Sequence, residues 1–175
     1  MANTYYKLAS TTIGTAIASV TFSSISQSYT DLKIVGSTRQ DGTANGIQLS
    51  LTFNSSASGY SRTLVYGAGS GSPVSVTGNS EALARFGWAQ DGAYTANVFG
   101  DFEIYIPSYS GSTYTKSFLG NSVTENNATE AYMGPHSDLW TDTAAAITSV
   151  TITISSGTTL FSQYSTFSLY GIKSS

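Results

Sequence analysis

The sequence has one histidine, His136, and no cysteine, so nucleophilic catalysis of the triad type would have to use that imidazole. A Ser-His-Asp triad needs histidine as its general base. The neighbours of His136 are Pro135, Ser137 and Asp138, residue types that are typical of turns. No Gly-x-Ser-x-Gly nucleophile elbow accompanies them. We therefore expect His136 in a loop or at an interface, and no catalytic role for it.

Asp101 and Glu103 are the best candidates for a pair of catalytic carboxylates. Glycosidases place two such groups about 5–9.5 Å apart. Two residues that are two positions apart in a strand share a face at about 6–7 Å, and Tyr105 follows on the same face. A chain with ten acidic residues is expected to contain one such pair by chance. We therefore favour a solvated strand face and keep the glycosidase as an alternative.

Metal and phosphate sites have weaker candidates. Asp41–Gly46 has oxygen-bearing residues at alternate positions, as a calcium loop does, but Thr52 stands where such a loop needs a glutamate. A hairpin turn explains the segment better. Gly67–Pro73 is rich in glycine but lacks the lysine and the helix of a phosphate-binding loop. We expect no metal and no cofactor.

Aromatic residues near the expected turns are the remaining candidates for a binding surface. Tyrosine and tryptophan anchor protein partners and can offer flat faces to sugars. Aromatic residues at strand spacing more often belong to a core. The candidates for contacts with a partner are Tyr105, Tyr109, Tyr114, Trp88 and Trp140.

These residues must be positioned by strands, because hydrophobic residues alternate with polar ones over most of the chain. The clearest strands are Ile47–Asn54, Phe102–Ile106 and Val150–Ile154. Further strands are predicted at Tyr5–Ala9, Ala18–Ser23, Asp31–Arg39, Ser61–Tyr66, Tyr114–Leu119 and Thr166–Lys173, with Leu83–Trp88 and Thr129–Met133 less clearly marked. The apolar positions of the clearest strands predict one core, formed by Ile47, Leu49, Leu51, Phe53, Phe102, Ile104, Ile106, Val150, Ile152, Ile154, Phe167 and Leu169.

Helix is nearly absent from this pattern. Ser80–Phe86 could start a helix with Ser80 as its cap, or could equally be the edge of a strand. Thr143–Ile147 could form one helical turn around its alanines. Short strands separated by glycine-rich turns predict an all-β fold, an antiparallel β-sandwich of jelly-roll type, with residues 1–175 as a single domain.

The composition narrows the classes of function. Only 10% of the 175 residues are charged, while 30 are serine and 24 are threonine, and the net charge is −3. Seven scattered cationic residues are too few to neutralise a nucleic acid, and no long apolar run predicts a membrane span. The N-terminal residues show no charged segment followed by an apolar one, so we expect no signal peptide. Such a weakly charged, hydroxyl-rich surface is suited to packing against other proteins.

Three stretches resemble small virion structural proteins of tailed bacteriophages, of the β-sandwich type found as head decoration (cement) or tail-fibre-associated proteins. They are Tyr5–Ser10 with Ser19–Ile25 and Tyr29–Ile34, then Asp101–Tyr109, then Ile147–Val150 with Tyr164–Lys173. These are fold motifs from both ends and the middle of the chain, so they carry over no catalytic residue. The resemblance implies a sandwich fold and a place in a virion that is assembled in the cytoplasm of a bacterial host.

The resulting hypothesis is a non-enzymatic capsid decoration protein that stabilises the phage head. Its partners would be the major capsid protein and copies of itself, as a trimer at a symmetry axis of the shell, with neither nucleic acid nor a membrane. The alternative is a tail-associated module that binds a carbohydrate or a receptor through tyrosine and tryptophan. Exposed aromatic residues beside Asp and Asn would favour the sugar-binding alternative.

Overall fold

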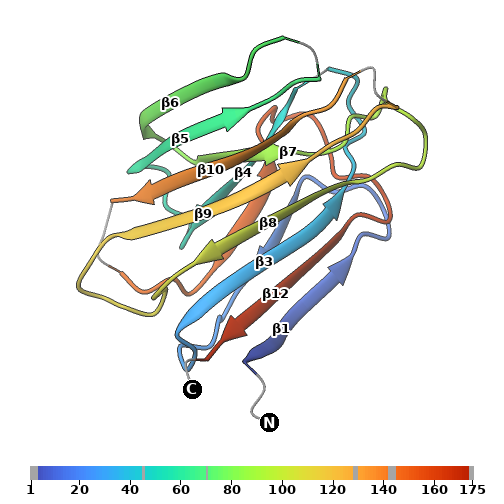
Figure 1. The fold of residues 1–175 in the computed structure, drawn as a ribbon. Helices are drawn as coiled ribbons and strands as arrows, with labels where there is room; N and C mark the ends of the chain where they lie inside the picture. The colour runs from blue at the N-terminus through green and yellow to red at the C-terminus, as the bar shows by residue number, and fades with distance from the viewer. Residues whose placement is uncertain (1–3, 45, 70, 128–129, 142–144, 174–175) are drawn as a thin grey trace.

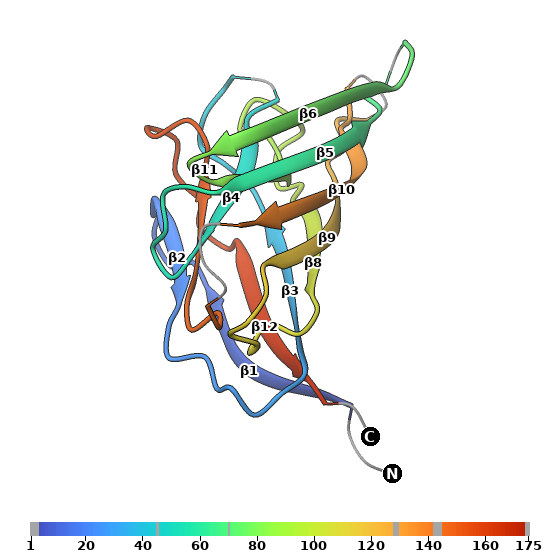
Figure 2. The same cartoon turned by 90° about the vertical axis from the view of Figure 1, so that its left-hand side faces the viewer.

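The two sheets of this protein lie face to face (Figures 1 and 2). The computed structural model describes residues 4–44, 46–69, 71–127, 130–141 and 145–173, and over these it forms twelve strands and no helix. The larger sheet has the order β1 (Tyr5–Thr12), β12 (Thr166–Ile172), β3 (Asp31–Thr38), β8 (Gly100–Ile106), β9 (Lys116–Val123), β10 (Met133–Trp140), β5 (Tyr60–Tyr66) and β6 (Val74–Glu81). The smaller sheet has the order β2 (Ser19–Phe22), β11 (Val150–Ile154), β4 (Gln48–Phe53) and β7 (Ala84–Trp88).

All strand pairs in both sheets are antiparallel, which confirms the all-β class and the two-sheet arrangement. Figure 2 shows β2, β4 and β11 on one side of the molecule and β3, β8 and β9 on the other. Within the described residues, no helix is long and apolar enough to cross a membrane.

The core lies between the sheets and is built by the alternation read from the sequence. Leu49, Leu51 and Phe53 are fully buried on β4, and Phe102, Ile104 and Ile106 are buried on β8. Of the predicted core, only Ile47 is partly buried, and it packs against the rest. The period of two therefore places each predicted apolar face inward.

The ring of Phe102 lies over a glycine of the neighbouring strand β3. Gly36 pairs with Phe102 of β8, and a Cβ added to Gly36 would lie 2.3 Å from the Phe102 ring. The missing side chain lets that ring reach Phe86 and Phe167, with ring centroids at 5.3 and 6.0 Å. Phe102 thus joins the two sheets at this point.

The expected loop around His136 is wrong, because this segment is the central part of β10. Met133–Trp140 pairs with β9 on one side, and its second half pairs with β5 on the other. His136 and Asp138 face inward, while Met133 and Pro135 face outward. The inward polar residues hide the strand from a search for apolar alternation.

Ser80–Phe86 is not a helix, because it contains the end of β6 and the start of β7. Ser80 has a left-handed backbone, with φ at 54°, at the point where the chain leaves one sheet for the other. The second helical candidate, Thr143–Ile147, falls partly outside the described residues, and residues 145–147 form no regular structure. Asp41–Gly46 closes no hairpin, since β3 and β4 belong to different sheets.

Candidate functional site

The eight-stranded sheet has an outer face on the side away from the smaller sheet. Side chains that alternate with the core residues form rows across neighbouring strands on this face. One row runs from Val65 through Pro135, Asn121, Glu103 and Val35 to Ser168, and the next runs from Met133 through Val123, Asp101 and Ser37 to Thr166. We call this surface the outer face.

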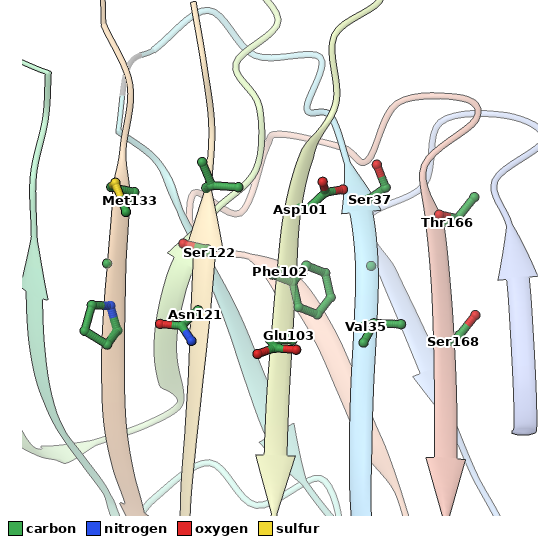
Figure 3. A pocket seen from close by; sticks show the side chains of 14 residues that line it. Val35, Ser37, Asp101, Phe102, Glu103, Asn121, Ser122, Met133, Thr166 and Ser168 are labelled. Carbon is green, nitrogen blue, oxygen red and sulfur yellow. The ribbon is translucent and has the colours of Figure 1, made fainter. Parts of the chain in front are cut away.

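A hollow of about 550 Å³ lies in the outer face, over the strands from β10 to β12. Figure 3 shows Met133 on one side, Asp101 and Glu103 in the middle, and Thr166 and Ser168 on the other side. Small side chains and the glycines Gly36 and Gly134 line part of the hollow. The surface is therefore concave where side chains are short and raised where Met133 stands.

Exposed apolar side chains lie on β5, β9 and β10 of the outer face, and two of them, Met133 and Val123, line the hollow. Met133 is 62% exposed, Leu119 53%, Val65 44% and Val123 43%. Met133 and Val123 are directly paired across β9 and β10. Side chains of this size leave water readily when a protein partner covers them. We call these four residues, together with Pro135, the apolar flank.

The neighbouring part of the outer face, over β8 and β3, is polar, and several of its groups are already paired. Lys33 Nζ lies 2.7 Å from Glu103 Oε2. The Tyr105 hydroxyl donates to Asp31 Oδ2 at 2.7 Å, and the Ser108 N–H donates to Asp31 Oδ1 at 2.7 Å. The hydrogen bond to Asp31 raises the pKa of Tyr105 to about 12. Tyr105 is therefore held in place, half-buried, on the face.

The five aromatic candidates do not form one surface. Trp140 ends β10 and is 1% exposed, so it offers no surface to a partner. Tyr109 is fully buried and donates its hydroxyl to the Ser26 carbonyl. Trp88 is 4% exposed and stacks on Tyr132 at 5.1 Å. Burial of these three rings follows from their size, because the core gains most from large apolar groups.

Tyr114 is the one strongly exposed member of the set, at 47%, and Tyr105 is half-buried. Lys116 Nζ lies 4.6 Å from the centre of the Tyr114 ring and donates to the Tyr114 carbonyl at 2.7 Å. Burial lowers the pKa of Lys116, which is 1% exposed. Tyr105 and Tyr114 are thus the candidates that remain accessible to a partner.

His136 and Asp138 form a buried pair between the sheets, away from the outer face. His136 Nδ1 lies 2.5 Å from Asp138 Oδ2, and both side chains are fully buried. Burial raises the pKa of Asp138, while the hydrogen bond to His136 and the charge of Arg62 lower it in part. Arg62 pairs with Asp138 across β5 and β10 and lies 3.4 Å from Glu81.

The remaining motifs have structural roles. Asp41 Oδ1 accepts the Leu160 N–H at 2.8 Å, which ties the loop after β3 to the loop before β12. Over the described parts of the chain, no three His, Asp or Glu side chains are grouped so that they could hold a metal ion. Asp101 and Glu103 do line the hollow together, as a glycosidase would require, but Glu103 is paired with Lys33.

Sequence reasoning missed the apolar flank. A signal was present, because Phe118 and Leu119 are adjacent apolar residues in a strand that alternates, so one of them must face outward. No protein-family model, curated protein or solved structure matches this chain. Its function must therefore be inferred from the outer face itself.

Proposed function

We propose that this protein is a non-enzymatic structural protein of a tailed-bacteriophage virion, a decoration protein that docks on the assembled head through its outer face. The observation that carries the proposal is the apolar flank, part of which borders the hollow of the outer face. Four exposed apolar side chains on adjacent strands are more than a monomer needs and are typical of a surface that another protein covers.

The charge of the outer face supports docking on a protein. Two of its acidic residues, Asp31 and Glu103, already have partners within the chain, Tyr105 and Lys33, while Asp101 is exposed in the hollow. Covering a paired charged group costs less free energy than covering an isolated charge. The paired group has already exchanged part of its hydration for a contact within the chain, so a partner displaces less water from it. A partner can therefore lie across both the apolar and the polar part of the face.

A decoration protein of this kind acts through mass action. If its contact surface exists only where shell subunits meet, binding stabilises the assembled shell over its separate subunits. The resemblance to tailed-phage virion proteins supports this role, and so does the repeated crossing of the chain between the sheets, which we attribute to a jelly-roll arrangement. Contacts with the major capsid protein and between copies of this chain belong to the same proposal, as does localisation in the virion.

The proposed lack of enzymatic activity is supported by the pairing of Glu103. A glycosidase needs one carboxyl group that delivers a proton. One carboxylate oxygen of Glu103 instead lies 2.7 Å from the ammonium group of Lys33, and Asp101 is the other acidic residue that lines the hollow.

Binding to heads tests the proposal. Purified protein is mixed with undecorated heads of the phage that encodes it, and bound protein is measured after sedimentation. We expect saturable binding at a copy number comparable to that of the shell protein, weakened about tenfold or more by Met133→Ser with Leu119→Ser. Tyr164→Asn is the control, because Tyr164 is 66% exposed but lies outside the outer face. Absence of binding to heads would contradict the proposal.

The hollow favours a second function, a tail-associated module that binds a carbohydrate or a receptor. Asp101, Glu103 and Asn121 place oxygen and amide groups in one concave site, as sugar hydroxyls require. Calorimetry with oligosaccharides of the host surface tests this function. Binding that Asn121→Ala abolishes, together with no binding to heads, would favour the second function over the first.

A further inference from the structure

The two sheets have four edge strands, and one of these strands has an unobstructed hydrogen-bonding edge. The edges are β1 and β6 in the larger sheet and β2 and β7 in the smaller one. An edge strand presents unpaired N–H and C=O groups, and soluble proteins obstruct such edges with short strands, bulges, lysine, proline or covering segments.

Three of the four edges are obstructed. β1 carries the exposed Lys7 and a bulge between Lys7 and Ala9. β2 has only four residues. β7 has a bulge in its pairing with β4, and its Trp88 N–H donates to Ser122 Oγ of β9 at 3.2 Å.

The fourth edge, β6, has none of these features along its regular part. Val74–Gly78 pairs with β5 in unbroken register, and the bulge between the two strands lies beyond Gly78. Among the described residues, no backbone hydrogen bond joins β6 to any segment other than β5. Pro73 precedes the strand, so every residue of Val74–Gly78 keeps its N–H group.

The charges around β6 also leave its edge free of repulsion. Its one charged residue, Glu81, lies 3.4 Å from Arg62 and 3.3 Å from Arg85, both on strands of the same chain. Val74, Ser75, Val76, Thr77 and Gly78 carry no charge, and three of them are β-branched residues that favour strands.

We propose that β6 is the interface between two copies of this chain, which pair their β6 strands in antiparallel fashion around a two-fold axis. The regular segment is complementary to itself when Val76 lies opposite Val76 of the second copy, with the two-fold axis between them. Ser75 then lies opposite Thr77 of the second copy, and Val74 lies opposite Gly78. No like charges meet in this register, and the backbone groups left open in each copy are satisfied by the other.

Such pairing joins the two eight-stranded sheets into one continuous sheet. The local two-fold axis of an antiparallel pair stands perpendicular to the sheet, so both outer faces point the same way. The apolar flank lies over β5, β9 and β10, the strands nearest to β6 in the order of the sheet. The two flanks therefore approach each other across the axis, whether or not the protein decorates a phage head.

Sedimentation velocity on the purified chain tests the pairing. We expect a concentration-dependent dimer, and Thr77→Lys should raise its dissociation constant by about tenfold or more, because it places a charge at the edge opposite the second copy. Thr63→Lys is the matched control: Thr63 is the exposed partner of Thr77 on β5, one strand further in. Thermal melting checks that both variants remain folded.

The double variant Ser75→Glu, Thr77→Lys tests the register. In the proposed register each lysine faces a glutamate of the other copy, so dimerisation should return to within about threefold of the unsubstituted chain. A monomer at all concentrations, a trimer, or a dimer that Thr77→Lys leaves unchanged would overturn the proposal. If Thr77→Lys weakens dimerisation and the double variant does not restore it, the register centred on Val76 is wrong.

Discussion

Asp138 shows how one residue can make stability depend on pH. Burial between the sheets disfavours its ionised form and raises its pKa, in spite of the hydrogen bond from His136. A carboxyl group whose pKa is raised by folding binds its proton more tightly in the folded chain. Its contribution to stability is full below the ordinary value of 3.8 and is lost as the pH rises through the raised value.

Asp138→Asn removes this titration and keeps a polar group beside His136. We expect the free energy of unfolding of the original chain, measured against that of the variant, to fall as the pH rises from about 4 to about 7. Urea unfolding at a series of pH values measures the difference. A difference for Asp138→Asn that stays constant with pH would contradict the assignment.

Gly36 is the residue where a single methyl group should matter most. Its added Cβ would meet Phe102 at 2.3 Å and the Thr166 carbonyl at 2.9 Å. We expect Gly36→Ala to lower the free energy of unfolding by about 1–3 kcal/mol, the usual cost of overpacking. Phe102→Leu in the same chain should recover part of the loss.

Gly14→Ala is the control for that measurement, because nothing lies within 4 Å of its added Cβ. Chemical denaturation of the three variants gives the comparison. Equal effects at Gly36 and Gly14 would show that the Phe102 ring can move aside for the added methyl group.

At the scale of elements, Asp31 joins the start of β3 to the end of β8 and the turn that follows. Its carboxylate accepts from the Tyr105 hydroxyl and the Ser108 N–H, and the first of these bonds is the largest cause of the raised pKa of Tyr105. Asp31→Asn should therefore lower the pKa of Tyr105 from about 12 towards 10.0.

Tyrosine-labelled NMR during a pH titration can follow that change. Tyr132, whose pKa is raised to about 12 mainly by burial, is an internal control that should not move. If the Tyr105 resonance titrates at an unchanged pH, the hydrogen bond to Asp31 does not hold this tyrosine.

Strands with an apolar inner face were predictable from sequence, and those with a polar inner face were not. The alternation in β4, β8 and β11 identified both the strands and the residues of the core. Only one face of each strand is buried, so apolar residues recur at every second position. β10 places His136 and Asp138 inward, where their mutual hydrogen bond replaces apolar contact. A pairing between side chains leaves no periodic signal in a single sequence.

The candidate site was less predictable for a related reason. Large aromatic residues were expected at a partner surface, but Trp88, Tyr109 and Trp140 are buried in the core. The outer face instead exposes aliphatic residues such as Leu119 and Met133, whose direction depends on register. Register across five strands is a property of the folded sheet, which local patterns do not specify.

At the scale of the whole molecule, the proposed role makes a prediction about heads. A protein present at a hundred times its dissociation constant stabilises the state that it binds by about 2.7 kcal/mol per site. Heads that are saturated with this protein should therefore release their DNA at a higher temperature than bare heads. Fluorescence of a DNA-binding dye during heating measures the release, and the Met133→Ser, Leu119→Ser variant should give no increase.

The position of β12 has a consequence for synthesis on the ribosome. This strand lies between β1 and β3, and it pairs Ile172 with Tyr5, so β1 has no neighbour in its sheet until residues 166–172 have been made. At about 5–20 residues per second, the N-terminal segment waits roughly ten to thirty seconds for its partner. For that time, the larger sheet of the nascent chain lacks the strand between β1 and β3. The unpaired N-terminal segment needs shielding from neighbouring polysomes. The larger sheet is therefore completed by a late segment, which inserts between two strands that were made long before it.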